Sequence, residues 1–443
     1  SKIALFLTSA AAYIAVLILF DELFLQASIV LPIPVRFSAL IPVVLLFGPP
    51  VYLLGFITPY AAQLSEKESK GEASGQIFAV GTIGSIIGAF GTTFFLIPWL
   101  NVEVIKLVFG VLLILGSVIV VGPDISRRIP FKHSVLVLVL LLGAFVGNSY
   151  GVTTLGDTVY KTQTPYQNLK VVDDGNVRTL YLDGQPQSAM YLDRPYRHVF
   201  DYTRYFHIPL LMTDDVDRVL FIGGGGFTGP KIFAKKYNVT VDVVEIDPEV
   251  IRVAKEYFRV NESEKLRIYN MDGRRFLETT EKEYDLIILD AYRKDKVPFH
   301  MTTKEFMDLA YDKLDDDGIL FANLISAPSG PGSKFYRAEY KTISQVFPRV
   351  YSFPTSNTEF VQNIELIATK SPRKITQEEL MERNRERDIG IDLSYEIGFY
   401  RSNVDTSGVP VLRDGKAPVA RLLDPMLGKK YVIEENRTAE GSG

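Results

Sequence analysis

Glycines and acids follow apolar segments in the middle of the chain. The apolar segment Arg218–Ile222 leads into Gly223–Gly229, which holds five glycines. Glycines let a backbone turn tightly and approach a ligand closely. Glu245 stands near the end of the next apolar segment, about 20 residues further on, where a carboxylate can accept hydrogen bonds from both hydroxyls of a ribose. This spacing predicts a nucleoside site.

Two further acids follow apolar segments in the same way. Asp272 precedes Gly273, so a carboxylate and a free backbone amide stand side by side. Asp290 comes directly after the apolar segment Leu286–Leu289. The carboxyl ends of parallel strands meet at one edge of a sheet, so both acids should lie beside the glycine loop. A carboxylate in that position is suited to take a proton from a substrate, and Asp290 is the candidate general base.

The elements that hold these residues alternate between strands and helices from residue 218 onward. This alternation predicts a parallel, doubly wound sheet. Asp247 before Pro248 is expected to cap a helix. Ahead of the sheet, Asn168–Val172 and Arg178–Leu182 with their Asp-Gly turns predict β-hairpins. The strands expected in the sheet are Arg218–Ile222, Val241–Ile246, Leu266–Tyr269, Leu286–Leu289, Ile319–Leu324 and Glu365–Ala368.

From Thr164 to about Phe347 the sequence resembles the polyamine aminopropyltransferases, the spermidine synthase family. The resemblance rests on Pro165-Tyr166-Gln167, Leu182-Asp183-Gly184, the glycine loop, Val244-Glu245-Ile246-Asp247, Asp272-Gly273, Asp290 and Thr303-Lys304-Glu305-Phe306. It implies a Rossmann-like α/β domain of the class I methyltransferase and spermidine synthase type, with a small N-terminal β-hairpin subdomain. Asp290-Ala291-Tyr292-Arg293 and Val297-Pro298-Phe299-His300 are similar to a subgroup fused to a membrane domain.

The resemblance also implies a role for each matching residue, with decarboxylated S-adenosylmethionine as co-substrate and no metal. Glu245 would hold the ribose, and Asp290 would accept a proton from the attacking amine. The donor-binding residues implied are Gln167, Gln187, Gly223, Gly225, Glu245, Asp272, Gly273 and Pro298. The candidate acceptor-binding residues are Tyr202, Gly226, Tyr292, Arg293 and His300. For His300, a role in capping the following helix is the alternative.

Two positions depart from the family pattern. Gly226 stands where the family usually has an acid that engages the aminopropyl amine, and Arg293 stands where it usually has an acid that grips the diamine. Two anionic contacts are therefore missing, each of which contributes about 1.5–3 kcal/mol when made. The departures favour an unusual amine acceptor rather than simply putrescine.

Two other functions stay open. In the first, Gly226 makes room for the carboxylate of intact S-adenosylmethionine and Arg293 attracts it, so that the protein methylates a lipid or another acceptor presented at the membrane. In the second, the domain senses a nucleoside without catalysis.

The first third of the chain differs in composition from the rest. Residues 1–150 hold eight Lys or Arg and seven Asp or Glu, and five long stretches carry no Lys, Arg, Asp or Glu. A spanning helix needs about 20 apolar residues, so these stretches predict about five transmembrane spans and an integral membrane protein in contact with the lipid bilayer. The pattern of Lys and Arg leaves open which side holds the polar domain. The stretches are Ile3–Phe20, Phe37–Ser65, Ala73–Val102, Leu107–Pro123 and Ser134–Gly156.

Composition sets further limits. The chain from residue 151 has 40 Lys or Arg against 45 Asp or Glu, which argues against nucleic acid as a partner. The chain has no Cys, which excludes disulfides and thiolate chemistry. The domains expected are a helical membrane domain over 1–156, the catalytic domain with its hairpins over 157–375, and a C-terminal extension over 376–443 that packs on it. The family resemblance implies a homodimer or homotetramer as a possible assembly.

Overall fold

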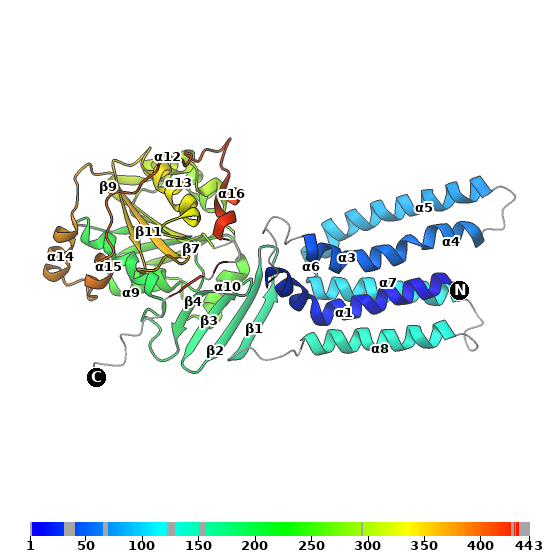
Figure 1. Ribbon diagram of the computed structural model, residues 1–443. Coiled ribbons are helices and arrows are strands. Elements are labelled where there is room, and N and C mark those ends of the chain that lie inside the picture. The colour runs from blue at the N-terminus through cyan, green and yellow to red at the C-terminus, as the bar shows by residue number, and fades with distance from the viewer. Residues whose placement is uncertain are drawn as a thin grey trace. The chain divides into compact units, whose positions relative to one another are not determined.

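The computed structural model describes residues 2–30, 40–64, 70–121, 129–149, 156–293, 296–426, 429 and 431–433. The chain divides into two compact units, Ser1–Thr154 and Leu155–Gly443. The first unit is helical and the second contains all the strands of the described chain (Figure 1). The segment from residue 376 onward belongs to the second unit.

The first unit is built from apolar helices. Four of them are long and apolar enough to cross a membrane, namely Lys2–Phe20, Leu40–Gln63, Ser74–Leu96 and Val102–Val121. The elements are α1 (Lys2–Val30), α3 (Leu40–Gly55), α4 (Ile57–Leu64), α5 (Lys70–Gly91), the π-helix η1 (Thr92–Leu96), α6 (Ile97–Trp99), α7 (Val102–Val121) and α8 (Ile129–Ser149).

The described residues therefore contain four of the about five spans expected from the sequence. The fifth predicted span began at Ser134, and this part of the chain does form a helix, α8. Helix α8 is 21 residues long, and its apolar stretch within the described residues is Lys132–Phe145.

Helices α1, α7 and α8 pack around a small apolar cluster that includes Ala11, Ile114 and Leu141. Three buried hydroxyls join the same helices. Thr8 Oγ1 lies 2.9 Å from Ser117 Oγ and 3.0 Å from Ser134 Oγ. Such contacts between small polar side chains join apolar helices to one another.

The second unit contains two sheets. The first is an antiparallel sheet in the order β1-β2-β3-β4, which confirms the expected hairpins and adds a strand on either side of them. Its strands are β1 (Asp157–Gln163), β2 (Asn168–Asp174), β3 (Val177–Leu182) and β4 (Gln185–Tyr191). The second sheet has seven strands in the order β10-β11-β9-β8-β5-β6-β7. They are β5 (Arg218–Ile222), β6 (Thr240–Glu245), β7 (Leu266–Asn270), β8 (Tyr284–Leu289), β9 (Leu314–Ser326), β10 (Arg349–Pro354) and β11 (Gln362–Thr369).

The expectation of a wholly parallel sheet is wrong at one edge. Strands β5 to β9 are parallel to one another, but β11 runs antiparallel to both β9 and β10. The connection from β10 to β11 is short and carries no helix, and a short connection can join only antiparallel neighbours. The strand β10 itself was not among those expected from the sequence.

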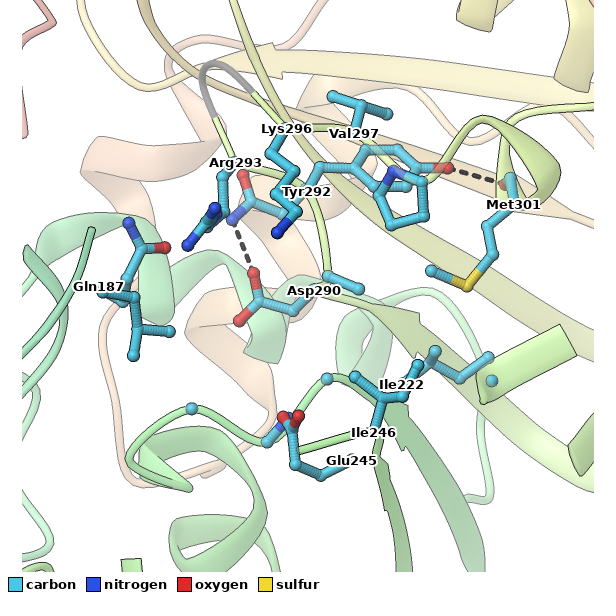
Figure 2. A pocket seen from close by; sticks show the side chains of 18 of the residues that line it. Gln187, Ile222, Glu245, Ile246, Asp290, Tyr292, Arg293, Lys296, Val297 and Met301 are labelled. Carbon is cyan, nitrogen blue, oxygen red and sulfur yellow. Dashed lines mark hydrogen bonds between the residues drawn. The ribbon is translucent and has the colours of Figure 1, made fainter. Parts of the chain in front are cut away.

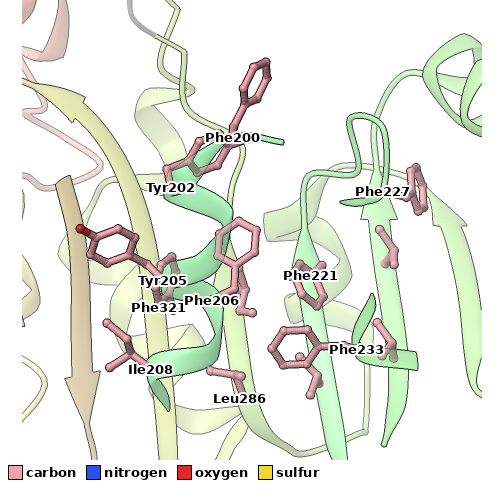
Figure 3. Packing of buried hydrophobic residues seen from close by; sticks show 14 of the residues in the cluster. Phe200, Tyr202, Tyr205, Phe206, Ile208, Phe221, Phe227, Phe233, Leu286 and Phe321 are labelled. Carbon is pink, nitrogen blue, oxygen red and sulfur yellow. The ribbon is translucent and has the colours of Figure 1, made fainter. Parts of the chain in front are cut away.

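Helices cover both faces of the seven-stranded sheet. One face packs against α9, α10 and the 3₁₀ helix η3, where Phe206, Phe221 and Phe233 form an aromatic cluster (Figure 3). The other face packs against α11, α12, α13 and α16. The bounds are η3 (Asp201–Leu211), α9 (Thr228–Lys236), α10 (Pro248–Tyr257), α11 (Gly273–Thr279), η4 (Phe299–Met301), α12 (Lys304–Asp312), η5 (Pro331–Ser333), α13 (Lys334–Ile343), α14 (Gln377–Glu386), α15 (Ser394–Ile397), α16 (Val419–Leu423) and η6 (Asp424–Met426).

Candidate active site

A cavity of about 460 Å³ opens where the parallel strands end. Its wall contains the glycine loop, the loop after β8 and residues of the β-hairpin sheet. In Figure 2 Asp290 lies between Arg293 and Lys296 on one side and Glu245 on the other. Of the residues singled out from the sequence, the cavity brings together Gln167, Gln187, Tyr202, Gly223, Gly225, Glu245, Asp272, Gly273, Asp290, Tyr292, Arg293, Pro298 and His300.

The glycine loop needs glycine for two physical reasons. Gly223 has a φ of 100°, and a Cβ there would lie 2.3 Å from the carbonyl oxygen of Asp290. Gly225 also has a positive φ, of 49°. The backbone at Gly223 therefore passes close to Asp290 at the tip of β8, and the loop then enters α9. The approach of this loop to a ligand, which the sequence pattern predicts, stays a prediction.

Glu245 ends strand β6 and is buried in the cavity wall. Its Oε2 accepts a hydrogen bond from the backbone amide of Gly224, and its Oε1 accepts one from Asp247 N–H, each at 2.9 Å. Burial raises the pKa of Glu245, while these backbone hydrogen bonds lower it. Asp247 caps helix α10 by accepting from Glu249 N–H, as expected from the Asp-Pro pair.

Asp272 lies at the start of α11 and has two partners. Its Oδ1 accepts from Arg275 N–H and so caps the helix, while its Oδ2 lies 2.9 Å from His300 Nε2. Helix α12, which follows His300, is capped by Thr303 instead. The alternative role for His300, capping that helix, is therefore wrong. His300 and Pro298 both line the cavity beside Asp272.

Asp290 follows β8 and faces the cavity. Its Oδ1 accepts a hydrogen bond of 2.8 Å from Asn323 Nδ2. Burial raises the pKa of Asp290 to about 6, while the hydrogen bond from Asn323 lowers it. A carboxyl with such a pKa is ionised at neutral pH and basic enough to take a proton.

Asn323 is itself held by a chain of hydrogen bonds that sequence reasoning missed. Asn363 Nδ2 donates to Asn323 Oδ1 at 2.8 Å, and Tyr431 O–H donates to Asn363 Oδ1 at 2.7 Å. All three side chains line the cavity. The position of Asn323 near the end of an expected strand was a usable signal. Tyr431 gave none, because it comes from the far end of the chain.

Arg293 does not lie free in the cavity. Its guanidinium donates to Asp183 Oδ2 at 2.8 Å and to Gln167 Oε1 at 3.0 Å. Lys296 Nζ donates to the carbonyl of Tyr166 at 2.6 Å. The two cations thus fasten the loop after β8 to the β-hairpin sheet. An Arg whose charge already faces Asp183 is a weaker attractant for a ligand anion than the sequence suggested.

Gly226 is the one candidate residue outside the cavity lining. A Cβ at this position would lie 2.8 Å from Ser188 Cβ and 3.2 Å from Phe258 Cδ1. The backbone N–H of Gly226 donates to Ser188 Oγ. The idea that Gly226 makes room for a donor carboxylate is therefore wrong, because Ser188 and Phe258 fill that space.

Two tyrosines complete the cavity wall. Tyr202 comes from η3, and its hydroxyl donates to the carbonyl of Gln187 at 3.1 Å. The hydroxyl of Tyr292 donates to Met301 O at 2.7 Å and lies 3.2 Å from Glu339 Oε1. Burial raises the pKa of both tyrosines, so both are neutral donors.

Comparisons with known proteins agree with the family suggested by the motifs. Residues 200–373 match the family model of the spermine/spermidine synthase domain. The polyamine aminopropyltransferase of Vibrio vulnificus is 30% identical over 228 residues, which are 49% of this chain and 74% of that protein. The same-named protein of Lachnospira eligens is 35% identical over 166 residues, which are 34% of this chain and 56% of that protein.

Among solved structures, a probable spermidine synthase from Corynebacterium glutamicum is similar to this chain with a TM-score of 0.47 and 22% identity. The match covers 60% of this chain and 98% of the other. The sequence matches carry the assignment, because one relative is matched over most of its own length. The chain belongs to the polyamine aminopropyltransferase family.

Proposed function

We propose that this protein transfers an aminopropyl group from decarboxylated S-adenosylmethionine to an amine other than simply putrescine, with Asp290 as general base. The observation that carries the proposal is the setting of Asp290. It stands at the end of β8 in the cavity, held by Asn323, with a pKa raised to about 6. The glycine loop and Glu245 lie in the same cavity, in the places that suit a nucleoside donor.

The chemistry needs little beyond orientation and one proton acceptor. The acceptor nitrogen attacks the methylene carbon bonded to the sulfonium of the donor. The new C–N bond forms as the C–S bond breaks, and methylthioadenosine leaves. Asp290 takes the proton that the nitrogen loses. Fixing both substrates in one cavity supplies much of the rate by proximity.

The donor would occupy the part of the cavity next to the glycine loop. Glu245 would accept hydrogen bonds from the ribose, and Asp272, Gly273 and Pro298 would surround the adenine. A Cβ at Gly273 would lie 2.3 Å from Ile222 Cγ2, so the backbone stays close to the sheet there. Gln167 and Gln187 would contact the sulfonium end, and Arg293 holds Gln167 by its Oε1 atom.

The acceptor side supports an unusual amine. Of the two acids that the family usually supplies, one is replaced by Gly226, which is packed under Ser188 and Phe258. The other is replaced by Arg293, which is paired with Asp183. Neither residue can receive an ammonium group, so the acceptor must be recognised by other residues.

The apolar helices of the first unit would anchor the enzyme in a membrane. Four of them have the length and composition that crossing requires. Many of their large apolar side chains, including Phe78, Ile87 and Ile119, are exposed in this chain. Exposed apolar side chains on helices of this length are best covered by lipid.

The test is product analysis by mass spectrometry on the purified full chain in detergent or lipid. The protein is offered decarboxylated and intact S-adenosylmethionine with a panel of amines and a lipid extract. The proposal expects methylthioadenosine, formed only when an amine is present and lost in Asp290→Asn. S-adenosylhomocysteine as the product would overturn it in favour of methyl transfer. Donor binding with neither product would favour a sensing role.

A further inference from the structure

Glu365 is a buried carboxylate to which the site described so far assigns no role. It lies on β11 directly opposite Asn323 of β9, and it is fully buried. Both of its carboxylate oxygens lack a hydrogen-bond partner among the residues that the structure describes. Leaving a buried carboxylate without any partner is strongly unfavourable, so this arrangement points to a partner that comes from outside the chain.

The side chain of Glu365 belongs to the sheet face that carries the active site. Its sequence neighbours Ile364 and Leu366 pack into the core on the opposite face, whereas Ile367 packs on the η3 face. Alternation along a strand therefore places Glu365 on the η3 face. Asn323 stands opposite Glu365 on the neighbouring strand, and it holds the Asp290 carboxylate.

Four other titratable groups interact electrostatically with Glu365. The charge of Asp290 acts on it from the tip of β8 and, together with burial, raises the pKa of Glu365. Glu365 in turn raises the pKa of Tyr202 and Tyr205 on η3 and of Tyr431 in the C-terminal segment. Glu365 is not among the residues that line the cavity, but Asn323 opposite it and Asn363 two residues before it on β11 are, so Glu365 lies behind the wall that these two side chains form.

The donors nearest to Glu365 are already used. Tyr202 O–H donates to Gln187 O, and Tyr431 O–H donates to Asn363 Oδ1. Asn363 Nδ2 donates to Asn323 Oδ1. The hydroxyl of Tyr205 has no partner within the described part of the chain, and Figure 3 shows it pointing away from the phenylalanine cluster. The Tyr205 hydroxyl and the Glu365 carboxyl are thus left without a partner among the described residues.

We propose that Glu365 is the anionic residue that recognises a second, cationic nitrogen of the amine acceptor, at the end of the cavity bounded by Tyr202, Asn323 and Tyr431. This inference rests on the proposed aminopropyl transfer. The reacting nitrogen must be neutral at Asp290, so the nitrogen that binds Glu365 is a different one. The acceptor is then a diamine or longer polyamine, and Glu365 supplies the charge that Gly226 and Arg293 do not.

The binding step predicts a release of protons. In the free protein, burial and the charge of Asp290 raise the pKa of Glu365 and so favour its protonated form. An ammonium group beside it favours the ionised form, so the carboxyl loses its proton when the cation binds. A monoamine of equal chain length brings no second cation and does not displace that proton.

The first experiment uses the wild-type protein and no mutation. Binding of a diamine and of the matching monoamine, each in the presence of methylthioadenosine, is measured by calorimetry in buffers of different ionisation enthalpy. The inference expects about one more proton released with the diamine than with the monoamine at the same pH, after subtraction of the protons lost by the free amines. Equal proton release would overturn it, and would indicate that an ordered water fills the space beside Glu365.

The second experiment compares Glu365→Gln with a matched control, Glu396→Gln. Glu396 is also buried with one unpartnered oxygen, but it pairs with Arg204, and its neighbours on α15 do not include a residue that lines the cavity. Glu365→Gln should lower kcat/KM for the diamine at least tenfold, with the monoamine rate and the Kd of the decarboxylated donor unchanged. The control should leave all three unchanged. An equal loss with both amines in Glu365→Gln would contradict the inference.

The outcomes separate this inference from the proposed function. If the wild-type protein forms methylthioadenosine and Glu365→Gln treats both amines alike, only the role of Glu365 fails. If the wild-type protein forms no methylthioadenosine with any amine, the proposed transfer fails and the role of Glu365 fails with it.

Discussion

The cavity has two proposed halves, a donor half around the glycine loop and an acceptor half on the other side of Asp290. They differ in how far they follow the family pattern. Around the glycine loop, Glu245 and Asp272 stand at the ends of consecutive strands and make the backbone contacts expected of such positions. On the acceptor side, the two family acids are replaced by Gly226 and Arg293. The polar groups there are Asn323, Asn363 and Tyr431 instead.

This difference shows which part of the site depends on the fold. The donor half is formed by backbone turns at strand ends, which the sheet itself determines. The acceptor half is formed by side chains from η3, β9, β11 and the C-terminal segment, which can change without altering the sheet. Substrate specificity can therefore differ between relatives that share a donor site.

The largest effect is expected from Asp290→Asn, which belongs to both halves. The amide cannot accept the proton of the attacking amine, so kcat should fall about 10²- to 10⁴-fold. The Kd of the decarboxylated donor should stay within a factor of two or so of the wild type, since the amide keeps the shape of the side chain. Methylthioadenosine release and calorimetry measure the two quantities. A normal rate in this variant would contradict the role of Asp290.

A smaller effect is expected from Glu245→Gln in the donor half. Loss of one charge-assisted hydrogen bond costs about 1.5–3 kcal/mol, so donor Kd should rise about ten- to 100-fold. The KM for the amine should not change. Glu264→Gln, at an exposed acid, serves as the control. A change in the KM for the amine with an unchanged donor Kd would contradict the prediction, because it would place Glu245 in the acceptor half.

Gly226→Ala tests the packing below the acceptor half. Its Cβ would meet Ser188 Cβ at 2.8 Å, so unfolding free energy should drop by about 1–3 kcal/mol through overpacking. Donor preference should stay the same, because the position does not line the cavity. Gly415→Ala is the control, since nothing lies within 4 Å of that Cβ. Thermal unfolding in detergent measures the stability of both variants. A shift away from intact S-adenosylmethionine would revive the methyltransferase hypothesis.

The smallest effect concerns the contact between Arg293 and Asp183. Their side chains are 11% and 32% exposed, and a double-mutant cycle with Arg293→Gln and Asp183→Asn should give a coupling of about 1 kcal/mol. The Lys255–Glu262 pair, whose side chains are 42% and 48% exposed, should give a coupling energy of only about a few tenths of a kcal/mol. If the two couplings were equal, Arg293 would be free to bind a ligand anion after all.

Much of the fold and of the donor half could be predicted from the sequence, because strands, turns and caps depend on local chemistry. The glycine loop, Glu245 and the Asp247 cap all follow from neighbouring residues. The acceptor half could not be predicted, since Asn363, Glu365 and Tyr431 meet Asn323 only through strand pairing and the return of the chain end. The pairing of Arg293 with Asp183 joins two loops 110 residues apart, which no local pattern reveals.

The most direct test of the account is the pH dependence of kcat/KM, in the wild type and in Asn323→Leu. Asp290 has a pKa raised to about 6, and its ionised form is the base, so activity should fall as the pH drops through that value. The leucine removes the hydrogen bond that lowers this pKa, so the acid limb should move to higher pH. The free amine titrates identically in both experiments, and any shift therefore belongs to the protein. An acid limb that stays in place would contradict Asp290 as the base.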